Sequence, residues 1–170
     1  MGSGYSNCYG GSNNSSSSTI SKHETPMHQK VQNWANRMRS KLTGAKKKYF
    51  KVACVVYDDN TKRFYYGRNG GINSPDVKRH PLLFGNEKKK GILPEKSLNN
   101  YIVGSCAEID AVNKALNHGS RIENLHILVI DARKQPKYFG NYMKSCENCT
   151  AALKGRVKEN YSGWESGGKK

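Results

Sequence analysis

The first block of apolar residues has helical spacing. Apolar side chains recur every three or four residues, at Met27, Val31, Trp34, Met38 and Leu42, which is the repeat of one face of an α-helix. Thr25 stands in a favourable N-cap position, Pro26 suits the first helical position, and Gly44 suits the end. We therefore predict a helix over residues 25–44 whose apolar stripe packs into the core.

The next two blocks predict a β-hairpin. Residues 49–57 form a nearly continuous apolar and β-branched run that is short enough for a buried strand. Turn residues at 58–61 lead into residues 62–68, where Phe64 and Tyr66 occupy alternate positions. Two such runs joined by a short polar turn are typical of a hairpin.

The second half of the chain predicts a helix, a strand and a helix. Ser105 precedes a helical repeat that ends at Gly119, residues 125–130 form a second buried strand, and a third helix runs from Ser145 through Leu153 towards Val157. The helix between the two buried strands favours a βαβ crossover and a parallel pairing within the sheet. This order of elements predicts an α/β domain with a central sheet flanked by helices.

The composition favours one modest domain with polar ends. Of the 170 residues, 35% are hydrophobic, and residues 1–24 are mostly Gly, Ser and Asn in low-complexity order. We predict a disordered leader or linker at residues 1–24, a folded domain at 25–160 and a polar tail at 161–170. No apolar run approaches the roughly 18 to 20 residues that span a bilayer, and the N-terminus lacks the apolar core of a secretory signal, so we expect no membrane association.

Two short motifs carry the candidate chemistry. Cys106-Ala107-Glu108 lies at the start of the second predicted helix, and Cys146-Glu147-Asn148-Cys149 lies at the start of the third. The positive ends of both helices favour thiolates, and cysteines three apart share one helical face. Three thiolates with a carboxylate nearby match a catalytic zinc that keeps one coordination position open for water.

The sequence leaves two other uses of these cysteines open. A structural zinc would take a fourth ligand from Cys54, His118 or His126. A redox dithiol at Cys146 and Cys149 is the second alternative, and it leaves the Cys106 motif without a role.

Together the motifs resemble those of the cytidine deaminase superfamily, whose signature is His or Cys, any residue, Glu, followed later by Pro-Cys-x-x-Cys. The resemblance covers about residues 45–158. It implies a three-layer αβα sandwich with a mixed, minimal sheet. It also implies zinc ligation by Cys106, Cys146 and Cys149, with Glu108 transferring protons while cytosine is hydrolysed to uracil.

The resemblance also indicates substrate contacts, and the motifs depart from the family pattern at one position. Asn69 and Asn73 resemble in position the asparagine with which family members hold the nucleotide. Ala107 and Ser145, which adjoin the motif cysteines, are further candidates for substrate contact. Ser145 replaces the proline of the family pattern, and we expect its hydroxyl to cap the third helix instead.

The charge favours a polymeric substrate. The chain has 29 Lys and Arg against 13 Asp and Glu, a formal net charge of +16, and residues 26–100 hold 17 of these cations against 5 acids. The cations cluster at Lys46 to Lys48, at Lys78 and Arg79, and at Lys88 to Lys90, in and before a long connection, residues 69–103, that has no clear period. Such clusters neutralise phosphates, which a free nucleoside does not require. We expect DNA or RNA as partner, with single-stranded DNA favoured.

Two further readings of the function stay open. One is a deaminase of adenine or of free nucleosides. The other is a nucleic-acid-binding module with a structural zinc. Within the superfamily, the Cys-Ala-Glu motif, the basic character and the Gly/Ser-rich leader resemble bacterial polymorphic-toxin deaminases, including the YwqJ-like group. That resemblance implies a toxin domain of a larger secreted effector that acts in the recipient-cell cytoplasm and is neutralised by an acidic immunity protein. We expect the domain to be a monomer.

Overall fold

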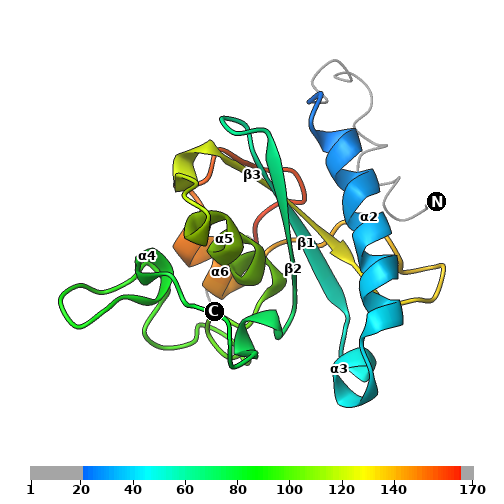
Figure 1. The fold of residues 1–170 in the computed structure, drawn as a ribbon, viewed down its shortest axis with the longest axis horizontal. Coiled ribbons are helices and arrows are strands. Elements are labelled where there is room, and N and C mark those ends of the chain that lie inside the picture. Colours follow the sequence, from blue (N-terminus) through cyan, green and yellow to red (C-terminus); the bar gives the residue numbers. More distant parts are fainter. Residues whose placement is uncertain (1–20, 166–170) are drawn as a thin grey trace.

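A four-stranded sheet forms the centre of the molecule (Figure 1). The computed structural model describes residues 21–165, so most of the predicted leader and residues 166–170 of the predicted tail lie outside the described part. The elements in chain order are α2 (Glu24–Lys41), α3 (Gly44–Lys48), β1 (Val52–Asp58), β2 (Arg63–Arg68), η2 (Gly71–Asn73), α4 (Pro81–Phe84), α5 (Ala107–Asn117), η3 (Ile122–Asn124), β3 (Leu125–Asp131), α6 (Glu147–Leu153) and β4 (Glu159–Asn160).

The sheet is mixed, with the strand order β2-β1-β3-β4. The predicted hairpin is confirmed, because β1 and β2 pair antiparallel over residues 53–58 and 63–68. β1 also pairs antiparallel with β3, so the two buried strands are not parallel neighbours. The reason is that α5 follows β2 rather than β1, and it carries the chain across β1 to the far side. The parallel pair joins β3 to β4, a strand that the polar sequence after Val157 did not indicate.

Helices cover both faces of the sheet, which confirms the three-layer αβα sandwich. In Figure 1, α2 lies on one side of the strands, and α5 and α6 lie on the other. Residues of β1 alternate between these layers: Ala53 and Val55 pack with the α2 side, whereas Cys54 and Val56 pack with α5 and α6. This is the period of two that a strand buried on both faces requires.

Several predicted helix boundaries differ from the structure. The first helix begins at Glu24, with His23 rather than Thr25 in the N-cap position. It ends at Lys41, and Gly44 opens the separate short helix α3. Among the described residues, no helix combines the length and apolar character needed to cross a bilayer.

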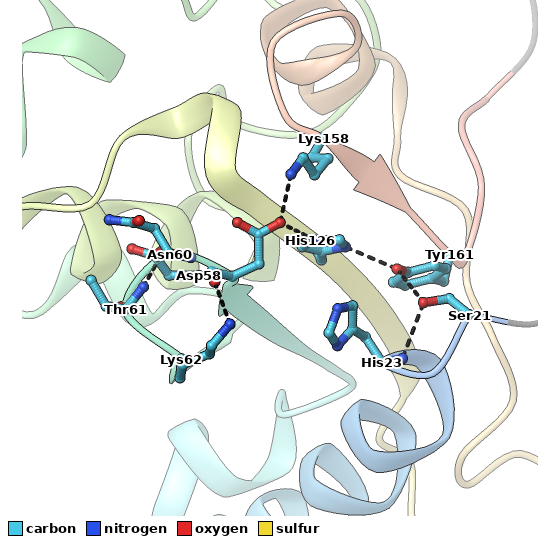
Figure 2. Close-up of polar contacts among 10 residues, drawn as sticks. Ser21, His23, Asp58, Asn60, Thr61, Lys62, His126, Lys158 and Tyr161 are labelled. Atoms are coloured by element: carbon cyan, nitrogen blue, oxygen red, sulfur yellow. Dashed lines mark hydrogen bonds and ion pairs between the residues drawn. The ribbon is translucent and has the colours of Figure 1, made fainter.

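A polar network on the α2 face of the sheet ties distant segments together (Figure 2). The buried His126 ring, on β3, lies 2.9 Å from Asp59 Oδ2 through Nε2 and 2.8 Å from the Tyr161 hydroxyl through Nδ1. Lys158 Nζ donates to the same Asp59 oxygen at 2.7 Å, and Tyr161 donates to Ser21 at 3.0 Å. The network therefore joins the start of the described chain, the β1–β2 turn, β3 and the segment around β4.

Candidate metal centre

Three cysteine sulfurs meet on the face of the sheet that α5 and α6 cover. The Sγ atoms of Cys106, Cys146 and Cys149 all lie within 4.8 Å of one another, and those of Cys106 and Cys146 are 3.4 Å apart. Sulfur ligands at the usual Zn–S distance in a tetrahedron are about 3.8 Å from each other. The sulfur geometry therefore fits a single zinc ion.

The local folding of α5 and α6 produces this convergence. Cys106 and Cys146 are the N-cap residues of α5 and α6, with extended backbone, and Cys149 lies in the first turn of α6. The unpaired N–H groups and positive dipole end of each helix start favour negative charge on these sulfurs. The apolar side of α5, which the helical repeat predicted, is buried against β1 and β2 and fixes the position of Cys106.

The protonation of the cluster also fits a cation. The hydrogen bond with Cys146 raises the pKa of Cys106, and the hydrogen bond with Cys106 raises the pKa of Cys149 well above its usual range. The pKa of Cys146 is lowered to about 2, because Cys106 and Cys149 both hydrogen-bond to its sulfur. Without a metal, these directions favour a Cys146 thiolate that accepts hydrogen bonds from the Cys106 and Cys149 thiols, and a bound divalent cation would displace the two thiol protons.

None of the three alternative zinc ligands joins the cluster within residues 21–165. Cys54 is buried in β1 with its sulfur 3.6 Å from the Val55 carbonyl oxygen. His118 lies exposed at the end of α5, where its Nδ1 is 2.9 Å from the Lys114 carbonyl oxygen. His126 belongs to the network on the opposite face. Residues 21–165 thus bring together three candidate zinc ligands, the number of protein ligands typical of a catalytic zinc site.

Glu108 lies beside the sulfurs, two residues after Cys106 in the first turn of α5. It is only 3% exposed. Burial raises the pKa of Glu108 to about 7, and hydrogen bonds with Ser145 and Cys149 oppose that rise. A carboxyl group that titrates near neutral pH can both accept and donate a proton at that pH.

Ser145 does not cap α6 as the sequence had indicated. Cys146 holds the N-cap position, without a side-chain cap hydrogen bond. The fully buried Ser145 hydroxyl instead accepts a hydrogen bond from Asn160 Nδ2 at 3.0 Å and hydrogen-bonds to Glu108. Ser145 therefore connects the buried carboxyl group to the segment around β4.

The other candidate substrate contacts are placed differently. Ala107 is buried next to Cys106. Asn69 and Asn73 line one hollow of about 320 Å³. The Asn69 side chain accepts from the N–H groups of Lys51 and Val52 and donates to the Tyr49 carbonyl oxygen. Asn69 thus holds the junction between α3 and β1, and contact of Asn69 or Asn73 with substrate stays a prediction.

Two asparagines that sequence reasoning missed support the site. Asn148, between the two cysteines of α6, is fully buried and accepts from the Leu98 N–H at 2.8 Å. Asn160 holds Ser145 from β4. The sequence offered one signal for Asn148: a polar amide lies between two cysteines that were expected to be buried, so the amide needs a buried hydrogen-bond partner.

The comparison with protein families agrees with this geometry. Residues 25–159 match the family model described as the cytidine and deoxycytidylate deaminase zinc-binding region. Searches of curated proteins and of solved structures return no match. The match spans most of the chain and contains all three converging cysteines and Glu108, so the protein belongs to the cytidine and deoxycytidylate deaminase zinc-binding family, whose members are zinc-dependent hydrolases of C–N bonds.

Proposed function

We propose that this protein hydrolyses cytosine to uracil in nucleic acid, with single-stranded DNA as the favoured substrate. The observation that carries the proposal is a buried carboxyl group, Glu108, beside three sulfurs that fit one zinc ion. A structural zinc site has no need for that carboxyl group. A hydrolase needs it to move protons.

The reaction exchanges an amino group for oxygen at C4 of the base. When bound to the three cysteines, zinc supplies a Lewis acid that lowers the pKa of water to about 7. Glu108 accepts the proton that water loses and delivers it to the ring nitrogen N3, which makes C4 electrophilic. Once the oxygen of that water has bonded to C4, Glu108 accepts its second proton and delivers it to the amino group, and the C4–N bond breaks as ammonia leaves. The pKa of about 7 for Glu108 suits transfer in both directions.

A basic hollow supports a polymeric substrate over a free nucleoside. It has a volume of about 440 Å³ and its lining includes six cationic side chains, those of Arg39, Lys47, Lys48, Lys51, Arg133 and Lys134. The hollow lies by Phe50, on the α2 side of the sheet, and two hydrogen bonds connect its Lys51 to the segment before Cys106. The Lys51 N–H donates to Asn69, and the N–H of Gly70 donates at 2.8 Å to the carbonyl oxygen of Ser105, the neighbour of Cys106. Arg133 is paired with Asp131 at 2.7 Å, and the other five cations suit the phosphates of a polymer, which a free nucleoside lacks.

The biological setting is part of the same proposal. We place the domain in a larger secreted effector that acts as a toxin in the recipient-cell cytoplasm. The high positive charge and the Gly/Ser-rich residues 1–24 support this setting. A neutralising partner would be acidic, because it must cover a surface with a net charge of +16.

One assay tests the function. Purified protein is incubated with single-stranded DNA, duplex DNA and RNA oligonucleotides and with free cytidine, and uracil is measured, with Glu108→Ala as control. We expect uracil in single-stranded DNA and none with Glu108→Ala. Activity on cytidine alone would contradict the polymer and toxin assignments. Binding of oligonucleotides without any conversion of cytosine or adenine would favour a module with structural zinc.

A further inference from the structure

Two large apolar side chains project into solvent just before the metal centre. Tyr101 is 61% exposed and Ile102 is 75% exposed, the highest values for large hydrophobic side chains among residues 21–165. Ile102 precedes Cys106 by four residues. A single exposed apolar residue is ordinary, whereas an adjacent aromatic and aliphatic pair this close in sequence to a metal ligand is a candidate for contact with a bound molecule.

The loop that carries this pair is fastened to the metal-binding turn of α6. We call residues 97–102 the 97–102 loop. The N–H of Leu98 donates to Asn148 Oδ1 at 2.8 Å, and Asn148 Nδ2 donates to the Ser97 hydroxyl at 3.0 Å. Asn99 Nδ2 donates to Glu147 Oε1 at 2.9 Å. Glu147 and Asn148 are the two residues between Cys146 and Cys149, so one helical turn holds two sulfurs and this loop.

Hydrogen bonds within the segment fix the backbone on either side of the pair. The Tyr101 N–H donates to Asn99 Oδ1 at 2.8 Å, and the Ser97 hydroxyl lies 2.6 Å from the Tyr101 carbonyl oxygen. The Ser105 N–H donates to the Ile102 carbonyl oxygen at 3.1 Å. The protein thus displays both side chains from an ordered backbone, which lowers the entropic cost of binding a ligand there.

We propose that the 97–102 loop binds the nucleobase next to the target cytosine, with Tyr101 stacking on that base and Ile102 packing beside it. This assignment rests on the proposed function. A target base must leave the stack to reach the metal centre, which leaves the neighbouring base without a stacking partner. An aromatic side chain replaces that partner and tolerates any base, because every base has a flat π-face.

The charge near the loop also suits a nucleic acid. Val103 follows the pair and lines a hollow of about 430 Å³ together with Lys89 and Lys90, as well as Phe84 and Leu93. Lys90 is paired with Glu95 at 2.5 Å, and the lining therefore leaves Lys89 as a cation for a phosphate of the bound strand.

The test compares Tyr101→Ala with wild type in two measurements. The first is the ratio of kcat/KM for a single-stranded DNA oligonucleotide to that for cytidine, which has no neighbouring base. We expect Tyr101→Ala to lower this ratio by about 5- to 150-fold, which corresponds to the loss of one base–aromatic contact. Tyr101→Trp should retain most of it. Ile102→Ala should also lower the ratio, and Leu82→Ala, which truncates an exposed aliphatic side chain on α4, is its matched control and should leave the ratio unchanged.

The second measurement is independent of turnover. Glu108→Ala protein is titrated into an oligonucleotide that carries 2-aminopurine beside the cytosine. Stacking on Tyr101 should quench its fluorescence, and adding Tyr101→Ala to that protein should remove most of the quenching.

The outcomes separate the loop assignment from the proposed function. If wild type deaminates the oligonucleotide while Tyr101→Ala alters neither the ratio nor the quenching, only the loop assignment is overturned. The same holds if an acidic protein binds the loop and DNA deamination does not depend on it. If wild type converts no oligonucleotide and the Glu108→Ala protein binds none, the proposed function has failed and the loop assignment fails with it.

Discussion

The polar clusters on the two faces of the sheet differ in charge, because only the cluster on the α2 face pairs its acid with basic side chains of the protein. On the α2 face, the two ring nitrogens of His126 hydrogen-bond with Asp59 and Tyr161. Asp59 also accepts a hydrogen bond from Lys158. On the α5 and α6 face, the sulfurs of Cys106, Cys146 and Cys149 lie within 4.8 Å of one another, and burial of Glu108 raises its pKa to about 7. The first cluster is complete within the chain. The second cluster joins three thiols and a carboxyl group, and a bound metal ion would supply its cation.

This difference separates a structural polar cluster from a reactive one. Buried polar groups normally find protein partners, because leaving one unpaired costs about 1 to 3 kcal/mol. A cluster in which an acid is paired with basic side chains of the same chain mainly stabilises the fold. A cluster of acidic groups without a basic partner, such as the three sulfurs and Glu108, can bind a metal ion and transfer protons. Substitutions in the cluster on the α5 and α6 face should therefore lower activity, whereas substitutions in the cluster on the α2 face should lower stability.

The largest effect should come from removing a sulfur. In Cys149→Ala the site has two ligands, so we expect zinc content to fall from one ion per chain to nearly none and deamination to fall to background. Inductively coupled plasma mass spectrometry and the uracil assay measure both. Cys54→Ala is the matched control, because that buried thiol lies outside the cluster and its loss should leave zinc in place. Full zinc content in Cys149→Ala would show that the three sulfurs do not act together.

The next effect concerns the buried carboxyl group. Glu108→Gln keeps the shape of the side chain but cannot exchange protons, so we expect kcat to fall by about 10²- to 10⁴-fold while zinc content stays at the wild-type level. Glu123→Gln, at an exposed acid, should retain wild-type kcat. Deamination by Glu108→Gln at the wild-type rate would remove Glu108 from its assigned role.

On the other face, the expected effect is on stability. His126→Ala removes both hydrogen bonds of a buried ring, and we expect the free energy of unfolding to fall by about 1 to 3 kcal/mol. Zinc content and kcat should not change. Chemical denaturation measures the loss, with His118→Ala at the exposed end of α5 as control. A large drop in kcat without a drop in stability would contradict the contrast between the two faces.

The smallest effect comes from Asp59. Hydrogen bonds from Lys158 and then from His126 hold the pKa of Asp59 below its usual range. A carboxylate with a lowered pKa stabilises the fold above its unfolded pKa, about 3.9, and this contribution is lost as the pH falls through the folded value. Asp59→Asn should cost about 1 kcal/mol at pH 7, and its difference from wild type should shrink below about pH 3.9. Asp76→Asn, at an exposed acid, is the control.

The sequence predicted the features that depend on local spacing. The helical repeat before Gly119 and the continuous run at residues 125–130 correspond to α5 and β3, and the two motifs fall at helix starts as expected. The three-layer fold and the convergence of the cysteines followed from that placement and from the family resemblance. Helix starts were less accurate, because the N-cap residues of the structure, His23, Cys106 and Cys146, are not of the Ser and Thr type that favours this position.

The features that depend on distant contacts could not be predicted. The antiparallel pairing of β1 with β3 arises because the chain enters α5 from β2, at the edge of the sheet, and then returns as β3 on the other side of β1. The Asn148–Leu98 hydrogen bond joins residues 50 positions apart, and Asn160 reaches Ser145 from β4. No local pattern encodes these contacts, and the short strand β4 has only two residues to show one.

X-ray absorption spectroscopy at the zinc edge, on reduced protein, tests the central claim most directly. Our account predicts three sulfur scatterers at about 2.3 Å and one oxygen scatterer at about 2.0 Å, the signature of a site with one position open to water. A shell of four protein ligands, or the absence of zinc from freshly purified reduced protein, would contradict it.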